Sequence, residues 1–95
     1  MAGTQFELNA EVRSQSADEM RVALQQLLPE ARIDKTELGW SVRAQLSGQS
    51  AKELNRNLLS GLRKVERHTT LRAEWTANGS VERFFDYVFK GRRSV

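Results

Sequence analysis

The stretch GWSVRAQLSGQSAKEL, residues 39–54, decides the fold, because FELNAEVRSQSADEM, residues 6–20, is a gapless second copy of most of it. Sliding one copy onto the other pairs Phe6 with Trp40, Leu8 with Val42, Ala10 with Ala44, Val12 with Leu46, and Gln15-Ser16-Ala17 with Gln49-Ser50-Ala51. Each copy first alternates apolar and polar residues, as a half-buried strand does. A short polar turn then leads to a Ser-x-x-Glu capping box, which predicts the start of a helix. The repeat therefore predicts two strand-and-helix units.

The rest of the chain supplies the strands that complete these units. Apolar residues at helical spacing predict helices from the Ser16 cap to about residue 28, where Pro29 follows, and from the Ser50 cap to about residue 65. Strands are expected over residues 5–12, 31–37, 40–47, 70–76 and 81–90. The strand over 31–37 is short and charged, which suits the edge of a sheet.

Two tandem strand-helix-strand units resemble the ferredoxin-like plait, an α+β architecture written βαββαβ, over about residues 5–76. In that architecture two helices cover one face of an antiparallel sheet whose strand order is 4-1-3-2. The fifth strand would extend the sheet beyond the fourth. Many unrelated functions occur on this architecture, so the resemblance implies a fold and no activity.

Composition and charge set further limits. A chain of 95 residues corresponds to one domain, which we place at residues 1–90, followed by a flexible basic tail at 91–95. There is no cysteine, no long apolar run and no signal-peptide pattern, so a cytoplasmic protein is expected. Residues 1–40 carry a net charge of −3 and residues 41–95 carry +6, which allows an anionic partner for the second half.

No residue pattern predicts chemistry. The chain has one histidine, His68, and a nucleophile would need such a base within reach. No cluster of histidine, cysteine and carboxylate residues predicts a metal site, and no glycine-rich loop precedes a helix to hold a phosphate. We therefore expect a protein that is not an enzyme and has no cofactor and no metal.

The fifth strand contains a group of aromatic residues that are candidates for protein contact: Phe84, Phe85, Tyr87 and Phe89. If Asn78-Gly79 is a two-residue turn, Arg72 pairs with Phe85, and Phe85, Tyr87 and Phe89 lie on the open face of the sheet. If the loop has three residues and a bulge, Leu71 pairs with Phe85 and these three aromatics face the core. The pattern favours the inward arrangement, because large aromatics prefer burial and the first register places Asp86 under the helices.

A second candidate surface is basic. The second helix has a stripe of cations opposite its apolar face, and the tail adds two arginines: Lys52, Arg56, Arg63, Arg67, Arg92 and Arg93. Such a stripe could neutralise successive phosphates of a polyanion, although a solvent-facing helix side is also ordinarily charged. Leu59 is expected beside these cations.

The outward positions of the first and third strands contain no aromatic residue, so base stacking on the central strands is not expected. The favoured interpretation is a small non-catalytic module that binds a protein partner, or a second copy of itself as a homodimer, through the aromatic fifth strand and the open sheet face. The alternative is binding of nucleic-acid phosphates through the basic stripe and tail, with little sequence selectivity.

Overall fold

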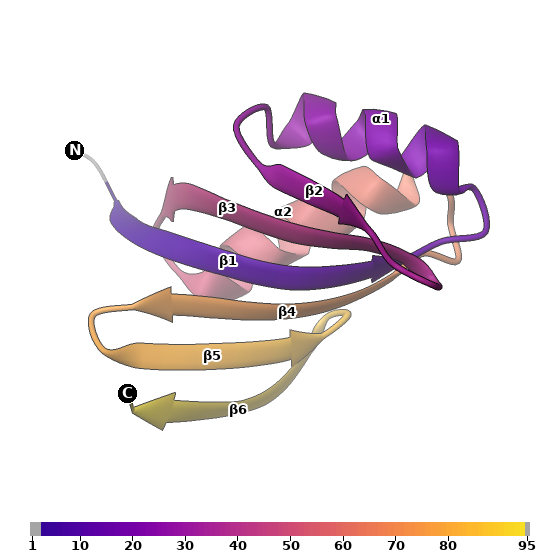
Figure 1. The fold of residues 1–95 in the computed structure, drawn as a ribbon. Coiled ribbons are helices and arrows are strands. Elements are labelled where there is room, and N and C mark those ends of the chain that lie inside the picture. Colours follow the sequence, from indigo (N-terminus) through magenta and orange to yellow (C-terminus); the bar gives the residue numbers. More distant parts are fainter. Residues whose placement is uncertain (1–2, 95) are drawn as a thin grey trace.

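The computed structural model describes residues 3–94, which form two helices and one antiparallel sheet of six strands (Figure 1). Along the chain the elements are β1 (Thr4–Arg13), α1 (Ala17–Leu27), β2 (Arg32–Lys35), β3 (Gly39–Gly48), α2 (Ala51–Arg63), β4 (Thr70–Ala77), β5 (Ser80–Phe85) and β6 (Val88–Ser94). Both helices lie on the same face of the sheet, and Figure 1 views the sheet from the opposite, open face. The α+β class predicted from the sequence is confirmed.

The strands lie side by side in the order β2-β3-β1-β4-β5-β6. The first four follow the order predicted for the two repeated units, and the charged strand β2 lies at an edge as expected. The prediction of a single fifth strand over residues 81–90 is wrong, because the chain turns back between Phe85 and Val88 and forms two strands. The second of these, β6, also includes Gly91 to Ser94, which were assigned to the tail. Val95 lies outside the described residues.

The sequence repeat becomes a pair of adjacent strands. β1 and β3 are antiparallel neighbours, and Phe6 lies opposite Leu46 while Val12 lies opposite Trp40. The apolar positions of both copies therefore point to the same side, where the helices cover them. Gly39 is required at the end of this ladder, because a Cβ atom there would collide with the carbonyl oxygen of Val12.

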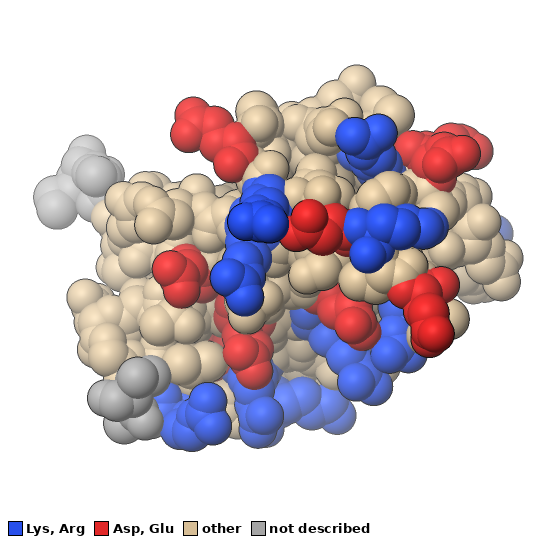
Figure 2. Space-filling view, viewed as in Figure 1, with Lys and Arg blue, Asp and Glu red and all other residues tan. Residues whose placement is uncertain are grey.

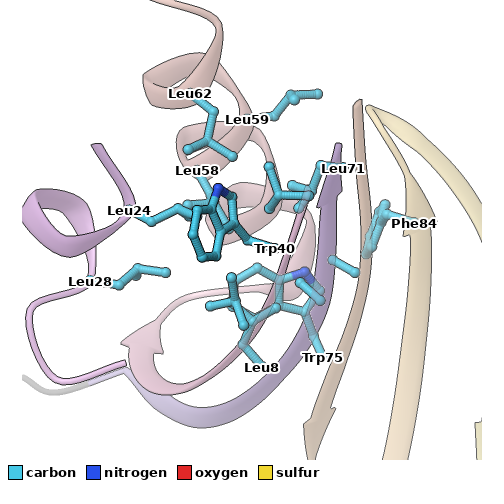
Figure 3. Close-up of a cluster of buried hydrophobic side chains, with 14 of the residues drawn as sticks. Leu8, Leu24, Leu28, Trp40, Leu58, Leu59, Leu62, Leu71, Trp75 and Phe84 are labelled. Carbon is cyan, nitrogen blue, oxygen red and sulfur yellow. The ribbon is translucent and has the colours of Figure 1, made fainter. Parts of the chain in front are cut away.

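The core fills the space between the sheet and the two helices (Figure 3). Trp40 of β3 and Trp75 of β4 contribute its largest side chains, and leucines of both helices pack around them. The indole N–H of Trp40 donates to the carbonyl of Ala17 at 2.8 Å, which ties β3 to the start of α1. Each buried leucine of this kind stabilises the fold by roughly 2 kcal/mol relative to an exposed one.

The buried face of α2 differs from the predicted one. Leu59, expected beside the cations, is fully buried, and so is Asn55. The second helix, expected to run to about residue 65, ends at Arg63, so Val65 no longer follows its periodicity and is 41% exposed. Asn55 is satisfied in the core, since its Oδ1 accepts from the indole N–H of Trp75 at 3.2 Å.

Of the two predicted capping serines, only the second makes its cap bond. The Ser50 hydroxyl accepts from the backbone N–H of Glu53 at 3.1 Å, as the pattern predicts. The Ser16 side chain makes no cap bond, so that half of the prediction is wrong. There the Ser14 hydroxyl accepts from the N–H of Ser16 at 3.1 Å and donates to Oε1 of Glu66 at 3.4 Å. The loop before α1 is therefore held by a residue of the junction after α2.

Glu66 joins two loops through its carboxylate. Its Oε2 accepts from the backbone N–H of His68 at 2.6 Å, and its Oε1 accepts from the backbone N–H of Gln15 at 3.4 Å. The His68 N–H bond is the main cause that lowers the pKa of Glu66 below its ordinary value of 4.5. A carboxylate with a lowered pKa stabilises the folded state above its unfolded pKa, and this stabilisation disappears as the pH falls through the folded pKa.

We predict that E66Q lowers the melting temperature at pH 7 by a few degrees, because the amide loses the charge-assisted bonds. The difference between wild type and E66Q should shrink as the pH falls below 4.5, since the wild-type carboxylate then becomes protonated. The melting temperatures of both proteins are measured from pH 7 to pH 3 by thermal unfolding monitored with circular dichroism. E37Q is the control, because Glu37 is an exposed loop residue whose carboxylate makes no hydrogen bond or ion pair among the described residues. A difference that stays constant over this range would contradict the assignment.

Candidate binding surfaces on the C-terminal hairpin

The register between β4 and β5 decides where the C-terminal aromatics lie. Ala77 pairs with Ser80 around the turn Asn78-Gly79, and both turn residues have positive φ. Arg72 consequently lies opposite Phe85. This is the two-residue turn, so the favoured register, in which Leu71 pairs with Phe85 and Phe85 faces the core, is wrong.

The turn at Asp86 explains why this register is stable. Asp86 has a φ of 55°, which ends the alternation of β5, and its backbone N–H donates to the carbonyl of Leu71 at 2.6 Å. Its Oδ1 accepts from the backbone N–H of Leu71 at 2.9 Å, and its own carbonyl accepts from the Asn55 amide at 2.6 Å. The Arg63 guanidinium lies 3.3 Å from the same Oδ1. Oδ1 of the carboxylate under the helices therefore has both a backbone N–H and a guanidinium as partners.

The turn separates the four aromatic candidates. Phe84 is 4% exposed and points into the core, where Phe89 of β6 meets it edge-on with ring centroids 5.3 Å apart. Phe85 lies on the open face, opposite Arg72. Tyr87 lies against α2, and its hydroxyl is 3.1 Å from that of Ser60. The proposed contact group is therefore distributed over both sides of the sheet.

Tyr87, Val88 and Phe89 nevertheless form a run of half-exposed apolar side chains where β6 begins, with exposed fractions of 47%, 56% and 49%. β6 is also the last strand of the sheet, at the lower border in Figure 1. Its outer edge has no neighbouring strand within the described residues. An edge strand of this kind has main-chain groups free to pair with another chain.

The basic stripe of α2 is only partly available. The Nε of Arg63 donates to the carbonyl of Thr69 at 3.0 Å, and its guanidinium pairs with Asp86 and lies 5.5 Å from the Tyr87 ring. Arg67 lies beyond the end of the helix. Lys52 and Arg56 remain exposed on α2. The structure therefore places two of the four predicted cations together on the helix surface.

The two arginines assigned to the tail lie within β6 and point to opposite faces. Arg92 is opposite Glu82 and pairs with it at 3.4 Å. Arg93 is opposite Val81, whose partner Thr76 belongs to the open-face positions of β4. Arg92 and Arg93 therefore do not act as one cluster.

The open face contains a basic group that the sequence pattern did not single out. Arg72, Arg83 and Lys90 surround Phe85 in a shallow depression of about 560 Å³. The guanidinium of Arg72 lies 4.7 Å above the Phe85 ring, and Lys90 Nζ lies 6.0 Å from it. Lys90 reaches this face because the β5–β6 ladder shifts its register at Arg83/Phe84. The Asn-Gly turn could have predicted Arg72, Arg83 and Phe85 here, but the bulge that adds Lys90 has no comparable signature.

Metal-binding clusters and membrane-spanning helices are both absent from the part of the chain that the structure describes. Residues 3–94 contain no group of three or more histidine, cysteine or carboxylate residues arranged to hold a metal ion. Within the same residues, neither helix has the length and apolar composition needed to cross a membrane. His68 lies beside a small depression with Arg13, Ser14 and Thr70.

Comparisons with protein-family models, with curated proteins and with solved structures found no match to this chain. Its function is therefore inferred from its own geometry.

We predict that D86A destabilises the protein by roughly 2–4 kcal/mol, because it leaves the Leu71 N–H without its acceptor and the Arg63 guanidinium without its carboxylate. D86N should cost less, since asparagine keeps an acceptor oxygen and tolerates positive φ. Urea unfolding measures both.

D34A is the matched control, because Asp34 also pairs with an arginine, Arg32 at 3.2 Å, but on the exposed edge strand β2. Its cost should stay below about 1 kcal/mol. Equal losses for D86A and D34A would contradict the anchoring role of Asp86.

Proposed function

We propose that this chain is a non-catalytic binding module that takes an extended segment of a partner protein onto the free edge of β6. The single observation that carries the proposal is the start of β6, where three successive apolar side chains are about half exposed beside an unpaired strand edge. Strand addition uses these two features together: the main chain provides hydrogen bonds, and alternate side chains provide specificity.

The charge of β6 favours a partner over a second copy. Three cations lie in this strand, at Lys90, Arg92 and Arg93, and only Arg92 has an ion-pair partner among the described residues. Two antiparallel copies of β6 would set these cations against one another, and like charges on adjacent strands are destabilising. A segment with acidic residues between its apolar ones would pair favourably. Cations and a bulge are also devices by which sheet edges avoid self-pairing.

We also propose that β1 to β4 with the two helices form a ferredoxin-like plait to which the β5–β6 hairpin is added. The strand order β2-β3-β1-β4 and the position of both helices on one face support this classification. In that arrangement β4 would normally be an edge strand. The added hairpin moves the edge outward by two strands and gives it the composition of β6.

The test uses two synthetic ten-residue peptides with valine at alternate positions and either glutamate or lysine between them. We expect the glutamate peptide to shift backbone amide NMR signals of β6, and the lysine peptide to bind at least tenfold more weakly. F89E should weaken binding of the glutamate peptide, because it adds a carboxylate to β6, the strand on which the peptide is proposed to bind. V22E, at an equally exposed valine of α1, is the control.

Two results would contradict the proposal: equal affinity for both peptides, or signal changes located away from β6. Sedimentation at tens of micromolar distinguishes the alternative occupant. A monomer agrees with the charge of β6, whereas a dimer that F89E dissociates would make a second copy the occupant.

A further inference from the structure

We propose that the basic half of the open sheet face, centred on Phe85, binds single-stranded nucleic acid. This site differs from the proposed β6 edge, because it lies on the flat of the sheet, centred on β4 and β5, and takes only Lys90 from β6. It also differs from the stripe on α2, which lies on the opposite side of the molecule.

The depression at this site has the size of a few nucleotide groups and is open along the sheet. Its volume is about 560 Å³, and β1, β3, β4, β5 and β6 all contribute to its lining. Polar side chains form its floor on the β1 and β3 side, including Asn9 and Ser41. A shallow, extended surface suits a flexible strand whose bases are unpaired.

The cations of this depression are not neutralised within the protein. No side-chain hydrogen bond or ion pair of residues 3–94 involves Arg72, Arg83 or Lys90. Of the two carboxylates that line the site, Glu11 already pairs with Arg13 at 3.2 Å. Glu74 lies opposite Arg83 in the register but forms no ion pair with it. Figure 2 shows lysine and arginine side chains gathered along the border of this face that β5 and β6 occupy.

Arg72 and Phe85 form a stacked pair that distinguishes this site from an ordinary charged surface. The guanidinium lies 4.7 Å from the ring centroid, so its planar group is held over the sheet. Bases of single strands stack on aromatic rings and on arginine planes alike. A base on this stack would leave its phosphates near Arg83 and Lys90. Stacking requires an unpaired base, which is why we infer a single strand and not a duplex.

The test measures fluorescence anisotropy of labelled ten-nucleotide uridine RNA and thymidine DNA over a salt series. We expect binding that weakens with salt, with a log-log slope that falls by about 0.7 for each cation removed from the site. The double variant R83A/K90A should therefore reduce affinity and flatten the slope for both strands. A preference for RNA or for DNA would identify which strand is the natural ligand.

The matched control is K52A/R56A, which removes two exposed cations from α2 and changes net charge by the same amount. F85L removes the ring but keeps an apolar side chain, and it should weaken binding roughly tenfold without altering the salt slope. Circular dichroism checks that each variant is folded. V22E, which adds a carboxylate at an exposed position of α1, should leave nucleic-acid binding unchanged. The glutamate peptide is titrated in a separate experiment, so failure of this site and failure of the β6 edge are separate results.

Three results would overturn the inference. The first is that neither the RNA nor the DNA strand binds at a low salt concentration of about 20 mM. The second is an equal loss of affinity for R83A/K90A and K52A/R56A, which would make the attraction a property of net charge. The third is equal affinity for a ten-base-pair duplex together with no effect of F85L, which would leave phosphate contact alone.

Discussion

The placement of the β5–β6 hairpin depends on the contact between Asp86 and the start of β4. Five groups meet there: the backbone and side chain of Asp86, the backbone of Leu71, the amide of Asn55 and the guanidinium of Arg63. This contact ends β5 after Phe85 and sends the chain back as β6. Without it, β5 could continue in either register, and the faces of Phe84 and Phe85 would be exchanged.

The same contact explains why the sequence predicted the core strands well and the hairpin poorly. The alternation in residues 6–12 and 40–46, the Asn-Gly turn and the second capping serine are local signals, and each of them forms as predicted. For the hairpin register, the local signal of the Asn-Gly turn opposes the expected burial of the aromatics and the cost of Asp86 under the helices, and the pattern favours the burial. A carboxylate under the helices is an argument against the register only when its partners are unknown. Those partners, the Leu71 N–H and the Arg63 guanidinium, are distant in the sequence. The contacts that make the part-buried Asp86 acceptable are therefore tertiary.

The second helix shows the same limit of pattern reasoning. A stripe of cations at helical spacing reads as one surface, but Arg63 is the residue that reaches down to Asp86 and the Thr69 carbonyl. Asn55 likewise looks like a surface residue and instead bridges Trp75 to the hairpin. Both side chains hold α2 against the hairpin. The polar residues of the helix therefore do not all belong to its solvent-exposed surface.

The excess positive charge of the second half is consequently divided between two places. Arg63 and Arg92 are paired and Arg67 lies beyond the helix end, so Lys52 and Arg56 remain together on α2. Arg72, Arg83 and Lys90 form the second group, on the open face, and none of these five cations has an ion-pair partner among the described residues. The two-residue turn at Asp86-Tyr87 leaves Phe85 and Val88 on the open face, whereas Phe89 lies opposite Phe84 on the helix side. The apolar start of β6 therefore reaches both sides of the sheet. Lys90 belongs to the open-face depression and also to β6, so a polyanion on the open face and a strand at the β6 edge would both draw on the same cation.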